Sequence, residues 1–169
     1  GFIAGVMHPI LGPDHMLAMV AVGLWGAQLK SPAIWILPLT FPMVMACGGL
    51  LGIAGIEMPY VEVGISLSAL VLGLAVAGNV RAKLWFAMII VGLFAVFHGH
   101  AHGNELPSAV NPLAYGVGFV LSTGLLHLCG VLIGLAIRWP FGSACIRACG
   151  GFIALTGGFF LFSSAGLLG

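Results

Sequence analysis

The sequence predicts an all-α integral membrane protein, a bundle of six transmembrane helices in which the first helix is broken. Of its 169 residues, 61% are hydrophobic and only 5% are charged, whereas a soluble domain carries about 25% charged residues. The apolar residues form six long segments, and a transmembrane helix needs about 20 such residues. This composition excludes a soluble globule and a disordered chain. A net charge of +1 without a basic run also argues against a nucleic-acid partner.

Short polar turns separate the six segments, and residues 1–169 are predicted to form a single transmembrane domain. A Lys-Ser-Pro turn at residues 30–32 ends the first segment, and a turn with Glu57 and Glu62, interpreted as solvated, follows the second. The Gly, Asn and Pro content of residues 103–108 predicts a loop. The predicted spans are approximately residues 1–29, 33–56, 63–80, 84–102, 112–137 and 146–169.

The distribution of charges tests this count of six spans. When loops alternate between the two sides, one side receives all the basic residues, which are Lys30, Arg81, Lys83, Arg138 and Arg147. The opposite side receives Glu57, Glu62, Glu105 and both termini. Basic loops remain in the cytoplasm, so both termini are predicted on the outer, periplasmic side of a bacterial inner membrane.

Two pairs of glycines have the spacing that lets membrane helices approach closely. They are Gly48 with Gly52 and Gly130 with Gly134, each pair four residues apart and therefore on one helix face. The chain contains 27 glycines, so such pairs also arise by chance. Packing within the chain is the preferred interpretation, and a contact in an oligomer is the alternative.

The first group of ionisable residues lies inside the first predicted span, where such residues are costly and mark a site or a pathway. His8 and His15 are seven residues apart, so they share a face if the segment is helical, and Asp14 precedes His15. Pro9 and Pro13 make a uniform helix improbable, and a broken helix frees carbonyl groups that can line an ion site. The group is a candidate cation site, and helix capping by Asp14 is the alternative.

The second group lies at the end of the fourth predicted span. His98 and His102 have the i, i+4 spacing by which one helix face presents two imidazoles to a metal, and Glu105 lies one turn beyond. His100 points elsewhere on a regular helix and is either a loop imidazole or a ligand of an outer site. A solvated interfacial pair is the alternative for the two facing histidines.

One further histidine, His127, lies halfway along the fifth span. It is either a hydrogen-bonded packing residue or a member of a deeper site. Imidazoles combined with a carboxylate suit Ni(II), Co(II), Zn(II) or Cu(II) better than Mg(II) or Ca(II), which prefer oxygen ligands. The sequence has no phosphate-binding loop, no His-Glu-x-x-His and no nucleophile with a base at a plausible spacing, so it predicts no enzyme.

Two strings, HPILGPDHMLAMVAVGLWGAQL at residues 8–29 and FHGHAHGNELP at residues 97–107, resemble the motifs of the HupE/UreJ family. These hydrogenase and urease accessory proteins are small nickel or nickel/cobalt permeases, and the likeness extends over essentially the whole chain. Pro13 departs from the usual pattern of the first motif. The functional residues that the resemblance implies are His8, Asp14 and His15 from the first motif and His98, His102 and Glu105 from the second.

The leading hypothesis is a secondary permease that imports Ni(II), with Co(II) as the second candidate, to supply metalloenzyme maturation. The second motif captures the ion at the outer mouth and passes it to the first motif, deeper in the bundle. The expected partners are the lipid bilayer, the metal ion and a cytoplasmic metallochaperone. Two alternatives stay open: a redox protein with haem between His15 and His127, and a metal sensor or assembly factor that does not transport.

Overall fold

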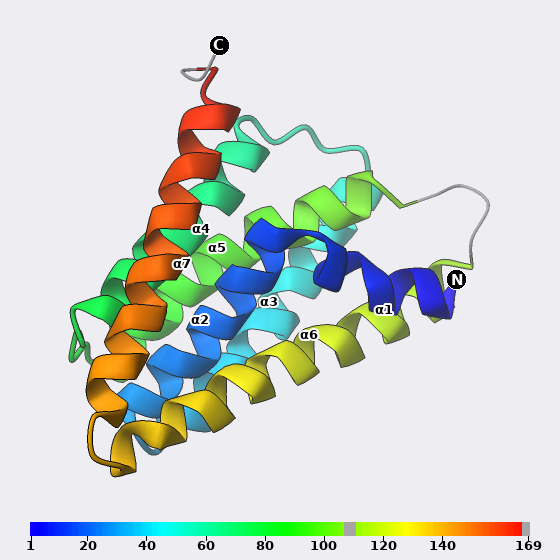
Figure 1. Cartoon of the computed structure of the whole chain (residues 1–169). Coiled ribbons are helices and arrows are strands. Elements are labelled where there is room, and N and C mark those ends of the chain that lie inside the picture. The colour runs from blue at the N-terminus through cyan, green and yellow to red at the C-terminus, as the bar shows by residue number, and fades with distance from the viewer. Residues whose placement is uncertain (107–110, 167–169) are drawn as a thin grey trace.

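The computed structural model describes residues 1–106 and 111–166. In these residues the helices are α1 (Phe2–Leu11), α2 (Pro13–Leu29), α3 (Ala33–Ile53), α4 (Val61–Ala77), α5 (Leu84–Asn104), α6 (Pro112–Gly134), the 3₁₀-helix η1 (Leu135–Arg138) and α7 (Gly142–Ser164) (Figure 1). The predicted all-α fold is confirmed. The end of the loop predicted at residues 103–108 and the last residues of the predicted sixth span lie outside the described residues.

Length and composition identify the helices that cross the membrane. α3, α5, α7 and the continuous stretch Pro112–Arg138 are each long and apolar enough to do so. α1 and α2 pass the same test as one broken span with a bend of 82°. α4 is apolar but has 17 residues, about 25 Å of helix, which is at the short end for a bilayer. The chain is therefore a multi-pass membrane bundle of about six membrane helices with a broken first helix, as predicted.

The helix ends differ from the predicted spans where polar residues continue a helix. α5 runs to Asn104, so all of the second motif's histidines are helical. α7 begins at Gly142, before the predicted start, and includes Arg147, whose Nε donates a 2.8 Å hydrogen bond to the Ala77 carbonyl of α4. Backbone hydrogen bonding extends a helix beyond its apolar stretch, so hydropathy alone places such ends too early or too late.

The break in the first span is at Gly12 and Pro13. Gly12 is extended, with φ −88° and ψ 100°, the conformation that a following proline favours. Pro13 then takes the first position of α2, where a missing N–H costs no helical hydrogen bond. His8 and His15 consequently belong to different helices, so they do not share one helix face as a uniform helix would require.

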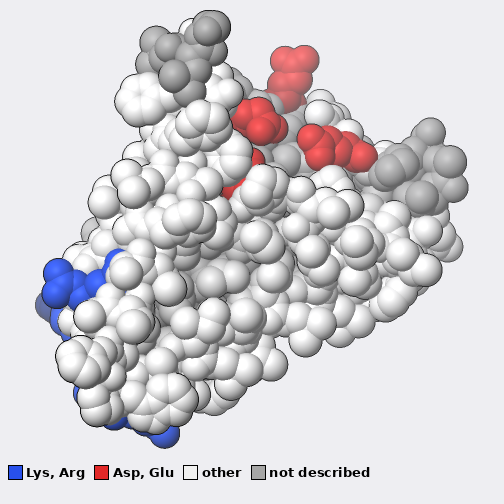
Figure 2. Space-filling model, viewed as in Figure 1, with Lys and Arg blue, Asp and Glu red and all other residues white. Residues whose placement is uncertain are grey.

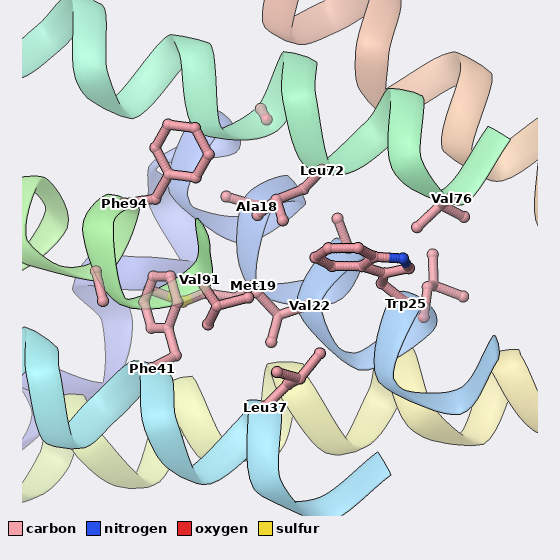
Figure 3. Packing of buried hydrophobic residues seen from close by; sticks show 14 of the residues in the cluster. Ala18, Met19, Val22, Trp25, Leu37, Phe41, Leu72, Val76, Val91 and Phe94 are labelled. Atoms are coloured by element: carbon pink, nitrogen blue, oxygen red, sulfur yellow. The ribbon is translucent and has the colours of Figure 1, made fainter. Parts of the chain in front are cut away.

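α2 is the central helix of the bundle. α3, α4 and α6 all pack against it, and most of its residues from Ala18 to Gln28 are buried. Figure 3 shows Met19 and Trp25 of α2 among apolar side chains from α3, α4 and α5. The indole Nε1 of Trp25 donates a 3.0 Å hydrogen bond to the carbonyl of Val80. A helix that is apolar on every side is stable only when it is surrounded in this way.

Glycines hold α5 tightly against α3. A Cβ on Gly52 of α3 would lie 2.5 Å from the His100 carbonyl oxygen, and a Cβ on Gly99 of α5 would overlap the Met45 carbonyl. The other predicted pair packs against α2, with Gly130 on the backbone of Val20. The glycines of both pairs therefore act within the chain, which agrees with the preferred interpretation.

Opposite ends of the bundle carry opposite charges. In Figure 2 the acidic side chains gather at one end and the basic side chains at the other. At the basic end, Lys30, Arg81 and Arg138 line a common hollow, and the Arg81 guanidinium donates to the Gln28 carbonyl. This segregation is the pattern expected of a protein whose two ends lie on opposite sides of a bilayer.

Candidate metal site

Five titratable side chains at the acidic end form two overlapping groups. His15, His98 and His102 form one group, called here the buried trio; His8, His102 and Glu105 form the other, the exposed trio. Within each trio the potential ligand atoms lie within 4.8 Å of one another. His102 belongs to both trios, so the two groups are one continuous cluster.

α5 supplies the histidines of the second motif. His98 and His102 lie one turn apart, so both imidazoles project from the same face. The intervening Gly99 packs on α3, which turns this histidine face toward the first span. The ring of His100 points away, and its Nε2 lies 2.7 Å from the Ile56 carbonyl oxygen. His100 is therefore outside the cluster.

The bend between α1 and α2 brings the first motif onto α5. The ring of His8 lies 4.7 Å from that of His102, and the ring of His15 lies 4.7 Å from His98 and 4.6 Å from His102, measured between centroids. Each trio thus contains residues of both motifs. The sequence hypothesis placed one motif in an outer site and the other in a deeper site, whereas the structure interleaves them.

Asp14 orients His15 and does not join either trio. Its Oδ1 lies 2.9 Å from Nδ1 of the His15 ring and accepts a second 2.9 Å hydrogen bond from the His15 backbone N–H. Nε2 of His15, at the other end of the ring, has no hydrogen-bond partner within the described residues. A carboxylate that binds one ring nitrogen fixes the tautomer and raises the basicity of the other, as in many metal sites. The alternative predicted for Asp14, helix capping, is limited to this one backbone N–H, because Gly12 is the N-cap residue of α2 and α2 has no side-chain cap.

Ser68 of α4 orients the imidazole of His98, as Asp14 orients that of His15. Its hydroxyl donates to the Ile65 carbonyl at 2.5 Å and lies 2.8 Å from Nε2 of His98. Because a hydroxyl has one proton to donate, Ser68 accepts from the His98 Nε2–H, and the lone pair of His98 is on Nδ1. Sequence reasoning missed Ser68, since a single serine in an apolar helix carries no distinctive signal.

Exposure decreases steadily along the cluster. The side chain of Glu105 is 54% exposed and that of His8 is 32% exposed, with 3.6 Å between the Glu105 carboxylate and His8 Nε2. The His15 side chain is 12% exposed, and His98 is fully buried. Glu62, interpreted from sequence as a solvated turn residue, is exposed but lies in the first turn of helix α4. The cluster is therefore most accessible to solvent at the acidic end.

The buried trio presents unpartnered nitrogens. Nε2 of His15, Nδ1 of His98 and both ring nitrogens of His102 lack hydrogen-bond partners within the described structure. Leaving a buried polar atom unsatisfied costs about 1–3 kcal/mol. A transition-metal ion with a preference for imidazole would satisfy three of these atoms at once.

His127 lies apart from both trios. The ring of Phe41, from α3, is between it and the cluster, with centroids 5.2 Å from His127 and 5.3 Å from His98. His127 is 1% exposed. The structure therefore does not bring it into the same group as His15.

The fold and the site together define a multi-pass membrane protein with a buried histidine cluster open to one face of the membrane. The family profile described as "HupE / UreJ protein" matches residues 1–160, and the chain belongs to the HupE/UreJ family. Protein HupE of Rhizobium leguminosarum bv. viciae is 46% identical over 157 residues, which is 93% of this chain and 82% of that protein. No solved structure matches the chain significantly. The family resemblance seen in the two motifs is confirmed.

Proposed function

We propose that this protein is a secondary permease for Ni(II), with Co(II) as the second candidate substrate. The observation that carries the proposal is the shared position of His102 in two trios that lead from an exposed carboxylate to a fully buried imidazole. The association of the family with hydrogenase and urease accessory function favours nickel, because imidazole-rich sites alone suit several divalent metals. The proposal includes no enzymatic activity.

Sharing one ligand lets the ion move without becoming free. An ion held by Glu105, His8 and His102 can exchange its first two ligands for His15 and His98 while His102 stays bound. Each step replaces lost ligands or water by imidazole nitrogen, which offsets the cost of desolvating a dication inside the bundle. Asp14 behind His15 adds negative charge near the buried trio.

The segregated charges support import from the acidic end. The positive-inside rule assigns the basic end to the cytoplasm, so the cluster entrance with Glu105 faces outward, as do both termini. In a bacterial inner membrane, nickel released at the basic end would reach hydrogenase or urease maturation, with a cytoplasmic metallochaperone as the receiving partner. Focusing of cations by the acidic entrance would aid capture.

Haem between His15 and His127 is disfavoured by the packing between them. The imidazole of His98 contacts His15, and the ring of Phe41 lies between His98 and His127. A porphyrin held by both histidines would have to displace these buried rings. A sensor or assembly factor would bind the metal in the same cluster, so only a measurement of flux separates it from a permease.

Uptake of radioactive Ni(II) into liposomes that contain the purified protein tests the proposal. Under a fixed inward metal gradient we expect saturable uptake, lost in His15→Ala and retained in the control His100→Gln, which keeps an N–H donor for the Ile56 carbonyl. Binding without uptake by the wild-type protein would instead support a sensor or an assembly factor.

A further inference from the structure

His127 is a deeply buried imidazole that neither trio uses. It lies on α6 with 1% exposure, and neither ring nitrogen makes a hydrogen bond within the described structure. A histidine kept only for packing usually has a partner for its N–H, because an unpartnered buried donor is costly. Its ring nitrogens are therefore available to a ligand.

The backbone of α3 provides an oxygen atom beside this ring. Pro42 lies four residues after Pro38 inside α3, and because proline has no N–H, the Pro38 carbonyl lacks its normal helical donor. The Pro38 backbone approaches the ring of His127, although the contact falls short of a regular hydrogen bond. Carbonyl oxygens freed inside a membrane helix are typical cation ligands.

A hydroxyl lies on the same face of α6. Thr123 precedes His127 by four residues, so the two side chains are neighbours on the helix surface. Thr123 is 0% exposed and its Oγ1 has no hydrogen-bond partner within the described residues, although a threonine inside a helix commonly bonds the carbonyl four residues earlier. Its oxygen is therefore free to act as a third ligand.

Phe41 separates this group from the buried trio. Its ring plane is inclined by 64° to that of His98 and by 78° to that of His127, and Phe41 is 0% exposed. In Figure 3 the ring lies in the core close to Met19 and Val91. An aromatic ring at this point blocks water, while its π face can stabilise a cation that passes.

We propose that His127, Thr123 and the Pro38 carbonyl form a second, inner binding station for the transported divalent cation, and that the Phe41 ring is the gate between the stations. The inference rests on the permease function proposed above and extends its route toward the basic end. The mixed nitrogen and oxygen ligands suit a borderline ion such as Ni(II). Two dications this close in a medium of low dielectric constant repel strongly, so the stations fill alternately.

Equilibrium dialysis with radioactive Ni(II), on protein in lipid nanodiscs, tests the station without transport. The double variant His98→Ala/His102→Ala removes both trios, and we expect weaker residual binding to remain. Adding His127→Leu should lower the residual affinity by about tenfold or more, whereas adding the control His100→Gln should leave it unchanged. Residual binding that is the same with and without His127 overturns the inner station.

Uptake into liposomes tests whether the inner station lies on the transport pathway of the ion. His127→Leu in the otherwise intact protein should reduce saturable Ni(II) uptake by about tenfold or more, with unchanged dialysis affinity at the trios. Wild-type uptake by this variant overturns the proposal and leaves the permease function standing. If the wild-type protein itself moves no nickel, the permease function fails, and the dialysis experiment still decides whether the station exists.

Thermal unfolding distinguishes a binding role from a structural role. Leucine fills the space of the imidazole without buried polar atoms, so the Tm of metal-free His127→Leu should equal or exceed that of the wild type. Thr123→Val removes a hydroxyl with little change of shape and should weaken residual binding in the same background. A lower Tm for His127→Leu with unchanged binding assigns His127 to packing and overturns the proposal.

Discussion

Ser68 on α4 fixes the tautomer of His98 on α5. The hydroxyl donates to the Ile65 carbonyl and accepts from His98 Nε2–H at 2.8 Å, which leaves the lone pair of His98 on Nδ1. Asp14 binds Nδ1 of His15 in the same manner. Two of the three imidazoles of the buried trio are thus oriented by a second residue, an arrangement that favours a metal ligand over a packing histidine.

Ser68→Ala should weaken Ni(II) binding by about tenfold, the lower end of the effect of losing a residue that orients a metal ligand. The His98 ring would then be free to rotate or to change tautomer. Ser66→Ala is the matched control, because Ser66 is equally buried on the same helix. Equilibrium dialysis of nickel measures both variants, and an equal loss of affinity would show that Ser68 acts only through helix packing.

Asp14→Asn separates the backbone hydrogen bond of Asp14 from its effect on the His15 imidazole. Asparagine can still accept from the His15 backbone N–H, so the Tm should change little, but its neutral amide no longer stabilises the imidazole. We expect nickel affinity to fall about tenfold to a hundredfold and uptake to be lost. Asp14→Ala should also lose about 1 kcal/mol of stability through the missing hydrogen bond to the His15 N–H. Normal uptake by the Asn variant would contradict the orienting role.

Periodic patterns in the sequence predicted the positions of the helices and which residues share one helix face. Hydropathy located the membrane helices, and the i, i+4 spacing predicted that His98 and His102 share a face. The partners of these residues depend on the bend of 82° between α1 and α2; Pro9 and Pro13 predict that the helix breaks, but no local pattern encodes the angle or direction of the bend. For this reason the sequence hypothesis separated the two motifs, whereas the structure interleaves them at His102.

Contacts between distant helices were beyond prediction for the same reason. Ser68 is 30 residues from His98 in the chain, and the ring of Phe41 lies between two histidines of other helices. Serine and phenylalanine are ordinary residues of an apolar helix, so their type carries no information about such roles. Only the packing of α3 and α4 against α5 reveals them.

Gly99→Ala should disrupt the histidine cluster, although Gly99 has no side chain that could bind a metal. A Cβ at this position would overlap the carbonyl of Met45, so α5 has to move away from α3 and take its histidines with it. We expect a loss of about 1–3 kcal/mol in the free energy of unfolding together with weaker nickel binding.

Gly92→Ala is the control for this change. Gly92 lies on the same helix, where a Cβ would meet only the Val44 side chain at 3.7 Å. The substitution should be neutral or should stabilise the helix by up to about 1 kcal/mol. Thermal unfolding in lipid nanodiscs compares the two variants, and equal behaviour would mean that α3 and α5 can separate without cost.

Glu105→Gln should act on capture and leave the buried trio intact. Glu105 is the most exposed member of the cluster, so its charge attracts the dication at the entrance and its removal should raise the KM for nickel uptake by about tenfold, with kcat little changed. Glu57→Gln is the control, because Glu57 is exposed in the turn between α3 and α4, outside both trios.

The ionic strength of the uptake buffer tests the physical origin of this effect. Attraction at an exposed entrance is screened by salt, so the KM of the wild-type protein should rise with salt while that of Glu105→Gln changes less. A lower kcat at constant KM would show instead that Glu105 acts during transfer, when the ion leaves His8 for His15. In that case its carboxylate would have to follow the ion inward, beyond the position in which it lies 3.6 Å from His8.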